Sequence, residues 1–245
     1  MSFLAWSRLF IVFAIIVGQK LIADPAQAQN TSGVSNPDVT DGAHSLGYRN
    51  SVAPSEGQDA FSHRVDYGHS FSDRTKTKFV VTQNNQNGDL KIRHVQIEGQ
   101  YQFAKMQEGW NSAIQLQGRV PTAHNVSGRM RIGWQNSFDL TSRVEFRAVL
   151  LAAREFGELA RDGIALETRS ELTVSDLRDM RLGVQMFNKY NTTADFGDFN
   201  EQQHQIGPII RGQITDDLKY GVGALFGVSR AANDAELRIF LGYSL

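Results

Sequence analysis

The chain has 245 residues, and its 25 basic and 26 acidic residues nearly cancel. This balance gives no support to nucleic-acid binding, which shows as a basic excess or a basic patch. The absence of cysteine excludes disulfide bonds and thiolate chemistry.

The N-terminus has the pattern of a secretory signal peptide. Arg8 precedes an apolar run from Leu9 to Val17, and small residues then stand at the −3 and −1 positions of a cleavage site. The run is shorter than the roughly 20 apolar residues of a membrane-spanning helix. We therefore predict a signal peptide over residues 1–28, a polar tail over 29–40 and one domain over 41–245. The alternative is a retained N-terminal anchor.

The rest of the chain consists of short segments in which apolar and polar residues alternate. A strand repeats every two residues, so each segment predicts a strand with one apolar and one polar face. The pattern is clearest over residues 61–71, 95–103, 126–134, 144–150, 164–174 and 218–226. Weaker segments cover residues 42–53, 75–84, 110–120, 180–190 and 204–214. Pro208 removes a ladder donor from the last of these, which predicts a bulge there.

The last nine residues, Leu237 to Leu245, alternate strictly. Every second residue from Leu237 is apolar, whereas Glu236, Arg238 and Ser244 belong to the opposite face. This segment brings the predicted number of strands to twelve, and ten is the alternative count.

The connections between these segments differ in length in a regular way. Short turns, most of them with an Asp, are predicted near Asp73, 104–109, Asp139, 175–179 and Asp216–Asp217. Longer polar loops are predicted at residues 54–60, 84–89, 121–125, 155–163, 191–203 and 229–234. Short turns at one end and longer loops at the other are typical of transmembrane β-barrels.

On these features, over its whole mature length, the chain resembles the β-barrel proteins of Gram-negative outer membranes. The resemblance implies an all-β fold, a transmembrane antiparallel up-and-down barrel that lies in the outer membrane after secretion. It also implies contact with outer-membrane lipid, and recognition by the barrel assembly machinery through the strand from Leu237 to Leu245. The chain departs from the family pattern at Leu245, where an aromatic residue is usual. An ordinary soluble β-sandwich or barrel is the alternative fold.

The polar faces carry many charged residues, and a barrel would enclose them. The residues predicted to line the pore are Arg64, Asp66, Arg119, Arg129, Arg131, Glu145, Arg147, Glu167, Arg169, Glu171, Arg211 and Arg238. Arginine stays charged, and its planar fork pairs with carboxylates. Two arrangements follow, and they overlap. One is a network of ion pairs that fills the interior, and the other is a water-filled channel whose arginine excess selects anions.

The leading prediction is therefore a passive, porin-like channel for small solutes, with anions favoured, and without enzymatic activity, cofactor or metal. One alternative is a structural or surface-interaction barrel with a closed lumen. Another is a lipid-modifying hydrolase. The pair Ser62–His63 does not support the hydrolase, because adjacent strand residues face opposite sides and cannot form a nucleophile–base hydrogen bond.

Two further features raise the question of a metal. The six histidines are scattered without ligand spacing. Asp195, Asp198 and Glu201 lie at intervals of three residues, which suits either a solvated acidic loop or an oxygen-ligand cation site. We favour the solvated loop.

Overall fold

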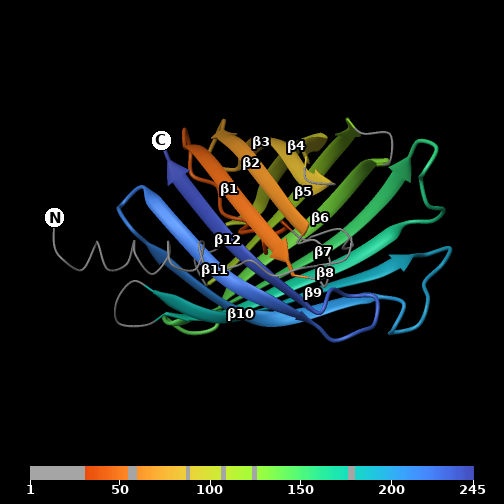
Figure 1. Cartoon of the computed structure of the whole chain (residues 1–245). Coiled ribbons are helices and arrows are strands. Elements are labelled where there is room, and N and C mark those ends of the chain that lie inside the picture. The colour runs from red at the N-terminus through yellow and green to blue at the C-terminus, as the bar shows by residue number, and fades with distance from the viewer. Residues whose placement is uncertain (1–30, 55–59, 87–88, 106–108, 123–125, 176–179) are drawn as a thin grey trace.

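The structure, a computed structural model, describes residues 31–54, 60–86, 89–105, 109–122, 126–175 and 180–245. Twelve antiparallel strands follow one another around a closed barrel, and the first pairs with the last (Figure 1). The strands are β1 (His44–Ala53), β2 (Ala60–Ser70), β3 (Thr75–Gln86), β4 (Asp89–Lys105), β5 (Trp110–Pro121), β6 (Gly128–Asp139), β7 (Val144–Phe156), β8 (Ala165–Ser175), β9 (Arg181–Thr192), β10 (Gln203–Gln213), β11 (Leu218–Gly227) and β12 (Ala235–Ser244). The predicted fold class and the count of twelve strands are confirmed. In the part of the chain that the structure describes, no helix is long and apolar enough to cross a membrane.

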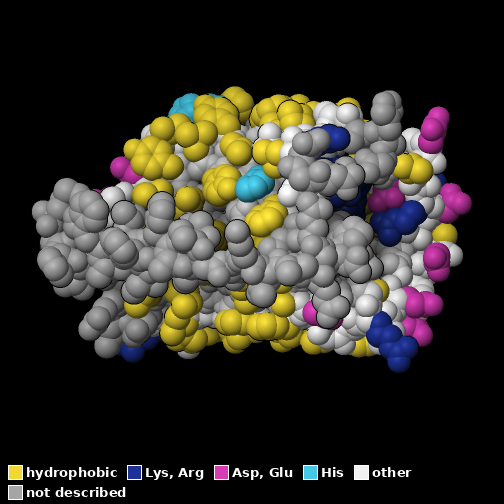
Figure 2. Space-filling view, viewed as in Figure 1, with side chains coloured by type: hydrophobic (Ala, Val, Ile, Leu, Met, Phe, Trp, Pro, Cys, Tyr) yellow, Lys and Arg dark blue, Asp and Glu magenta, His cyan; other side chains and the backbone are white. Residues whose placement is uncertain are grey.

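The sequence alternation becomes the two faces of the barrel wall. In β6, the outward side chains of Met130, Ile132 and Trp134 are 67%, 49% and 43% exposed. In β12, Glu236 and Arg238 point inward and are buried. Figure 2 shows this on the flank of the barrel, where apolar side chains predominate among those drawn in colour. A closed wall pairs its backbone polar groups internally, so this apolar exterior suits a lipid environment.

The seam between β1 and β12 closes the wall. Eight residue pairs join the two strands, from Ser45 opposite Ser244 to Val52 opposite Leu237. Inside the barrel, the buried Ser51 hydroxyl donates a hydrogen bond to Glu236 Oε1 across this seam. The seam therefore has both a backbone ladder and a lumenal side-chain contact.

The bulge predicted at Pro208 is wrong. Pro208 lies in β10 opposite Val184 of β9, without a register shift. On its other side, the pairing of β10 with β11 omits Gly207 and Pro208 and then resumes in the same register. Proline has no amide hydrogen to donate, and here this interrupts the pairing of β10 with β11 without adding a residue to either strand. Register shifts occur instead at Thr82/Gln83, Gln102/Ala104 and Ala165/Glu167.

The two ends of the barrel differ as the sequence indicated, with one exception. Short turns lie at the end that also holds the C-terminus, which we call the turn end. The longer connections after β7, β9 and β11 lie at the opposite, loop end (Figure 1). The predicted loop at 84–89 is wrong, because β3 and β4 pair as far as Gln86 opposite Asp89. Most of the expected loop is thus strand.

Charge on the outward face should be costly. Replacing Ile132 by Arg, near the middle of β6, is expected to lower the free energy of unfolding in lipid vesicles by about 2–4 kcal/mol. The measurement is a urea titration of the refolded protein. The matched control is Leu140→Arg in the turn after β6, where a similarly exposed leucine lies outside the strands. Equal losses for both variants would show that the β6 face does not contact lipid.

Candidate functional site: the charged lumen

All the residues predicted to line a pore lie on the inward face of the wall. Their side chains are buried or half-buried. All except Arg238 form ion pairs across strands or border the internal cavities, and Arg238 contacts Gln185 and two aromatic rings. They do not form one uniform ring. The carboxylates gather them into separate networks, and part of the arginine set at the loop end is left without a carboxylate partner among the described residues.

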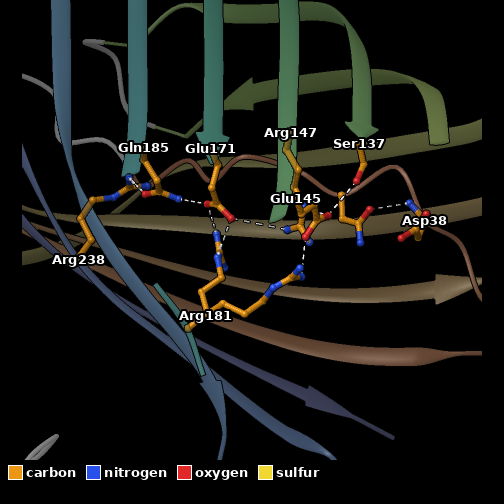
Figure 3. Close-up of polar contacts among 10 residues, drawn as sticks. Asp38, Ser137, Glu145, Arg147, Glu171, Arg181, Gln185 and Arg238 are labelled. Atoms are coloured by element: carbon orange, nitrogen blue, oxygen red, sulfur yellow. Dashed lines mark hydrogen bonds and ion pairs between the residues drawn. The ribbon is translucent and has the colours of Figure 1, made fainter. Parts of the chain in front are cut away.

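The largest network surrounds Glu145 and Glu171, on the inward faces of β7 and β8 (Figure 3). Glu171 accepts hydrogen bonds from Arg211 Nε at 3.0 Å and Nη2 at 2.7 Å. Glu145 accepts from Arg147 Nε at 2.6 Å and pairs with Arg181 Nη1 at 2.6 Å. These contacts join β7, β8, β9 and β10 through side chains, which rigidifies this side of the barrel.

Neutral groups extend the same network. Ser137 Oγ donates to Glu145 Oε1 at 2.8 Å. At the other end, Gln185 donates to Glu171 and accepts from Arg238 Nη1 at 3.3 Å (Figure 3). The guanidinium of Arg238 also lies 4.6 Å from the Phe187 ring centroid and 4.8 Å from that of Phe240. Aromatic faces thus stabilise a buried cation that has little carboxylate contact.

A second network centres on Glu98 of β4, which was not among the predicted site residues. Arg64 Nη2 donates to Glu98 Oε1 at 2.9 Å. Gln115 and Gln117 of β5 donate to the same carboxylate at 3.0 and 2.7 Å. The alternating run of polar residues in β4 predicted an inward face, but the partners of Glu98 depend on the register between strands.

Two further carboxylates, Asp66 and Glu167, each pair with two basic side chains. Asp66 pairs with Lys78 at 3.2 Å and with Arg64 at 3.6 Å. Glu167 pairs with Arg169 at 2.7 Å and with Arg131 at 3.7 Å.

The loop end of the lumen holds a cavity of about 430 Å³, which we call the loop-end cavity. Its charged lining comprises eight basic residues (Arg64, Arg93, Arg119, Arg129, Arg131, Arg161, Arg169, Lys189) and two acidic residues (Glu155, Glu167). Arg119 Nη2 donates only to a backbone carbonyl, that of Ser127, at 3.2 Å in the described structure. The Nε atoms of Arg119 and Arg129 have no hydrogen-bond partner among the described residues. These two Nε atoms are buried, so the two residues contribute positive charge to the cavity lining rather than exposed Nε donors.

One pair at the mouth of this cavity is bidentate. Arg161, in the loop after β7, donates through Nε and Nη2 to the two oxygens of Glu155 at 3.1 and 2.8 Å. These hydrogen bonds raise the pKa of Arg161 above its usual value.

A second cavity of about 250 Å³ lies deeper, and we call it the central cavity. Its charged lining comprises Arg49, Arg64, Lys76, Lys78, Arg131, Arg147, Arg169 and Arg211, with Glu98 as the acid. A third cavity of about 220 Å³ lies beside it, bordered by Arg49, Asp66, Lys78, Arg211 and Lys219. Arg49, Arg93, Lys76, Lys78 and Lys189 were not predicted. The alternation in the sequence could have identified them, because they lie on the inward faces of their strands.

Residues 31–40 also lie in the lumen. The side chains of Val34 and Val39 are 4% and 3% exposed, and Val34 packs into a buried apolar cluster with Val149, Leu151, Phe187 and Leu225. The amino-acid sequence of this stretch predicts only a polar tail. Its location inside the barrel has no counterpart in the strand pattern.

The Ser62–His63 pair and the acidic loop do not form the arrangements that catalysis or metal binding would need. Ser62 is buried on the lumenal side, whereas His63 accepts or donates a 2.8 Å hydrogen bond with Tyr48 on the outer face. In the acidic loop, Asp198 Oδ1 accepts from the Asn200 amide at 2.7 Å, and Glu201 Oε2 accepts from the Asp198 amide at 2.8 Å. Within the described ranges, no three His, Asp or Glu side chains are grouped to hold a metal ion.

Comparisons with known proteins agree on the fold. No protein-family profile matches the chain, and no curated protein matches it by sequence. Among solved structures, it is similar to the COG4313 outer-membrane channel from Pseudomonas putida F1, with a TM-score of 0.65, 8% identity and coverage of 87% of this chain and 100% of that chain. It is also similar to the NanC porin, with a TM-score of 0.62, 13% identity and coverage of 82% and 100%. A third match is the KdgM porin in complex with disordered oligogalacturonate, with a TM-score of 0.58, 12% identity and coverage of 82% and 99%.

These matches define the class of architecture. The chain is a closed barrel of twelve strands, and its fold is similar to that of outer-membrane porins and channels. At these identities the likeness concerns the fold alone.

Removal of a single buried carboxylate should destabilise the barrel. Glu171→Gln leaves Arg211 without its charged partner, and the expected loss is about 3 kcal/mol. The measurement is the urea concentration at the midpoint of unfolding, and heat-modifiable gel migration detects the folded fraction. Glu158→Gln, in the exposed loop after β7, is the matched control and should leave the midpoint unchanged. If the Glu171 variant unfolds at the control midpoint, the network does not stabilise the wall.

Proposed function

We propose that the protein is a passive outer-membrane channel for small anionic solutes. The observation that carries the proposal is the excess of basic side chains around the internal cavities, eight basic to two acidic residues in the loop-end cavity. Rings of charged side chains select ions of opposite charge in pores. The closely packed carboxylates neutralise some of the arginines, and the remaining arginines give the lumen a net positive charge.

The fold supports a proposed orientation in the membrane. The apolar exterior contacts outer-membrane lipid, the longer loops face outward, and the turn end with the C-terminus faces the periplasm. The last strand, from Leu237 to Leu245, is the segment proposed to meet the barrel assembly machinery. Cleavage of residues 1–28, which lie outside the described residues, precedes insertion in this proposal.

Acidic sugars are a chemically suitable class of solute. Their carboxylates accept two-point hydrogen bonds from arginine, whose fork matches this geometry. The similarity of the fold to the KdgM porin, solved with oligogalacturonate, supports the choice of this probe.

The first test is ion selectivity. The refolded protein in planar bilayers under a KCl gradient should give a reversal potential that favours chloride. In the double variant Arg119→Gln/Arg129→Gln, the chloride-to-potassium permeability ratio should fall about two-fold, since two unpaired cations leave the loop-end cavity. Arg154→Gln is the matched control, because Arg154 lies on the outward face of β7. Absence of conductance, or a preference for cations, would contradict the proposal.

The second test is block by an acidic sugar. Oligogalacturonate should interrupt the chloride current at concentrations where an uncharged oligosaccharide of equal length does not. The interruption should weaken at high salt, because mobile ions screen the lumenal charge. Equal block by both sugars would show that size, not charge, governs entry.

A barrel with a closed lumen is the second candidate, and one observation favours it. Residues 31–40 occupy part of the lumen. A structural or surface-interaction barrel would remain silent in the bilayer at every voltage. An enzyme is not proposed, since Ser62 and His63 lie on opposite faces of the wall.

A further inference from the structure

The segment formed by residues 31–40, which we call the lumenal segment, is held by side chains of the wall. Arg169 Nη1 donates to the Gly33 carbonyl at 3.0 Å, and Lys76 Nζ donates to the Asp38 carbonyl at 2.9 Å. Arg49 Nη1 lies 3.4 Å from the carbonyl oxygen of Thr31. These three basic side chains thus contact neutral oxygen atoms of the backbone.

Two glutamines of β4 hold the part of the segment nearest β1. Gln100 Nε2 donates to the Pro37 carbonyl at 2.7 Å, and the Val39 amide donates to Gln102 Oε1 at 3.0 Å. Asp38 bonds within the segment, its amide donating to Asn36 Oδ1 at 3.1 Å (Figure 3). Residues 31–40 have no strand or helix assignment. The segment is therefore attached through side chains and is not a strand of the wall, so it can leave the lumen without breaking the barrel ladder.

The position of the segment divides the lumen. Thr31 and Ser32 border the loop-end cavity. Residues 34–36 border the central cavity, and Gly33 and Val34 border the third. The three cavities thus meet the same ten-residue stretch, which lies between the basic lining at the loop end and the deeper basic lining.

The side chains that bind the segment also line the cavities. Arg169 borders the loop-end and central cavities, and Arg49 and Lys76 border the central one. A carboxylate adds the attraction between opposite charges to the hydrogen bond with a guanidinium or ammonium, and a neutral carbonyl does not. An anionic solute is therefore a stronger partner for these three side chains than the segment is.

We propose that residues 31–40 form an internal plug, which occupies the anion-binding donors of the lumen and is displaced when a multivalent carboxylate solute binds them. The proposal rests on the proposed function, and it names the regulation of that channel. Val34 seats the plug through the apolar cluster, and the basic side chains confer its sensitivity to anions. Loss of the plug joins the cavities into one continuous path.

The absence of cysteine allows a direct test by cross-linking in the full chain. Val34→Cys is combined separately with Val149→Cys and with Leu225→Cys, its neighbours in the apolar cluster. A disulfide should form in at least one pair, and conductance in citrate should be several-fold lower in the oxidised than in the reduced protein. The control pair is Leu116→Cys/Ile132→Cys, which face each other on the outer wall, and its conductance should not depend on oxidation. If neither test pair cross-links, or if oxidation leaves the conductance unchanged, the plug proposal fails.

A second variant makes the outcome independent of the cross-link. Deletion of residues 31–40 leaves all strands of the wall, and heat-modifiable migration verifies that it folds. Its conductance should be several-fold higher than that of the full mature chain and insensitive to citrate beyond ionic strength. A folded deletion variant with the conductance of the full chain overturns the plug.

A thiol probe then tests displacement by the solute. The reactivity of Ser35→Cys toward a charged maleimide should rise in citrate and remain unchanged in glucose or in KCl of equal ionic strength. If the reactivity rises equally in KCl, carboxylates do not displace the segment specifically, and its release depends on salt alone. Failure of the proposed function looks different, because the full chain and the folded deletion variant would then both be silent or both prefer cations.

Discussion

The closure of β1 onto β12 is the constraint on which the rest of the structure depends. A closed antiparallel wall satisfies its own backbone and assigns every second side chain to the lumen. Apolar residues can then cover the exterior, while glutamates, glutamines and arginines are enclosed together. Had the wall an open edge, the charged face would be solvated from the side and the ion-pair networks would lose their burial. The seam at Ser51 and Glu236 shows closure and lumenal chemistry meeting at one place.

Among the described lumenal residues, arginines outnumber the carboxylates that pair with them. The arginines therefore have four kinds of partner: carboxylates, aromatic rings, glutamines and backbone carbonyls. Glu145 and Glu171 bind arginines in ion pairs. Phe187 and Phe240 present ring faces to Arg238. Glutamines and backbone carbonyls, including those of residues 31–40, accept further hydrogen bonds. Neutral partners stabilise a cation without cancelling its charge, so the lumen keeps a positive sign even where it is well packed.

The sequence predicted the wall well and the arrangement of its contents less well, for physical reasons. A period of two residues determines which side chains face inward, and this alone placed Arg64, Glu171 and Arg238 in the lumen. The partner of each charge depends on register and on distant strands, as for Arg211 and Glu171, which lie 40 positions apart. The place of residues 31–40 could not be predicted, because a segment bound through wall side chains has no periodicity of its own.

The lumenal segment also constrains the order in which the molecule is built. Residues 31–40 lead directly into β1, and β1 receives β12, the last strand to be synthesised. The segment must therefore enter the lumen either before β1 pairs with β12 or after the barrel has closed. In the closed barrel Val34 is buried, and Arg169 of β8 and Lys76 of β3 donate hydrogen bonds to carbonyls of the segment. The same ten residues therefore connect the closure of the wall to the filling of its interior.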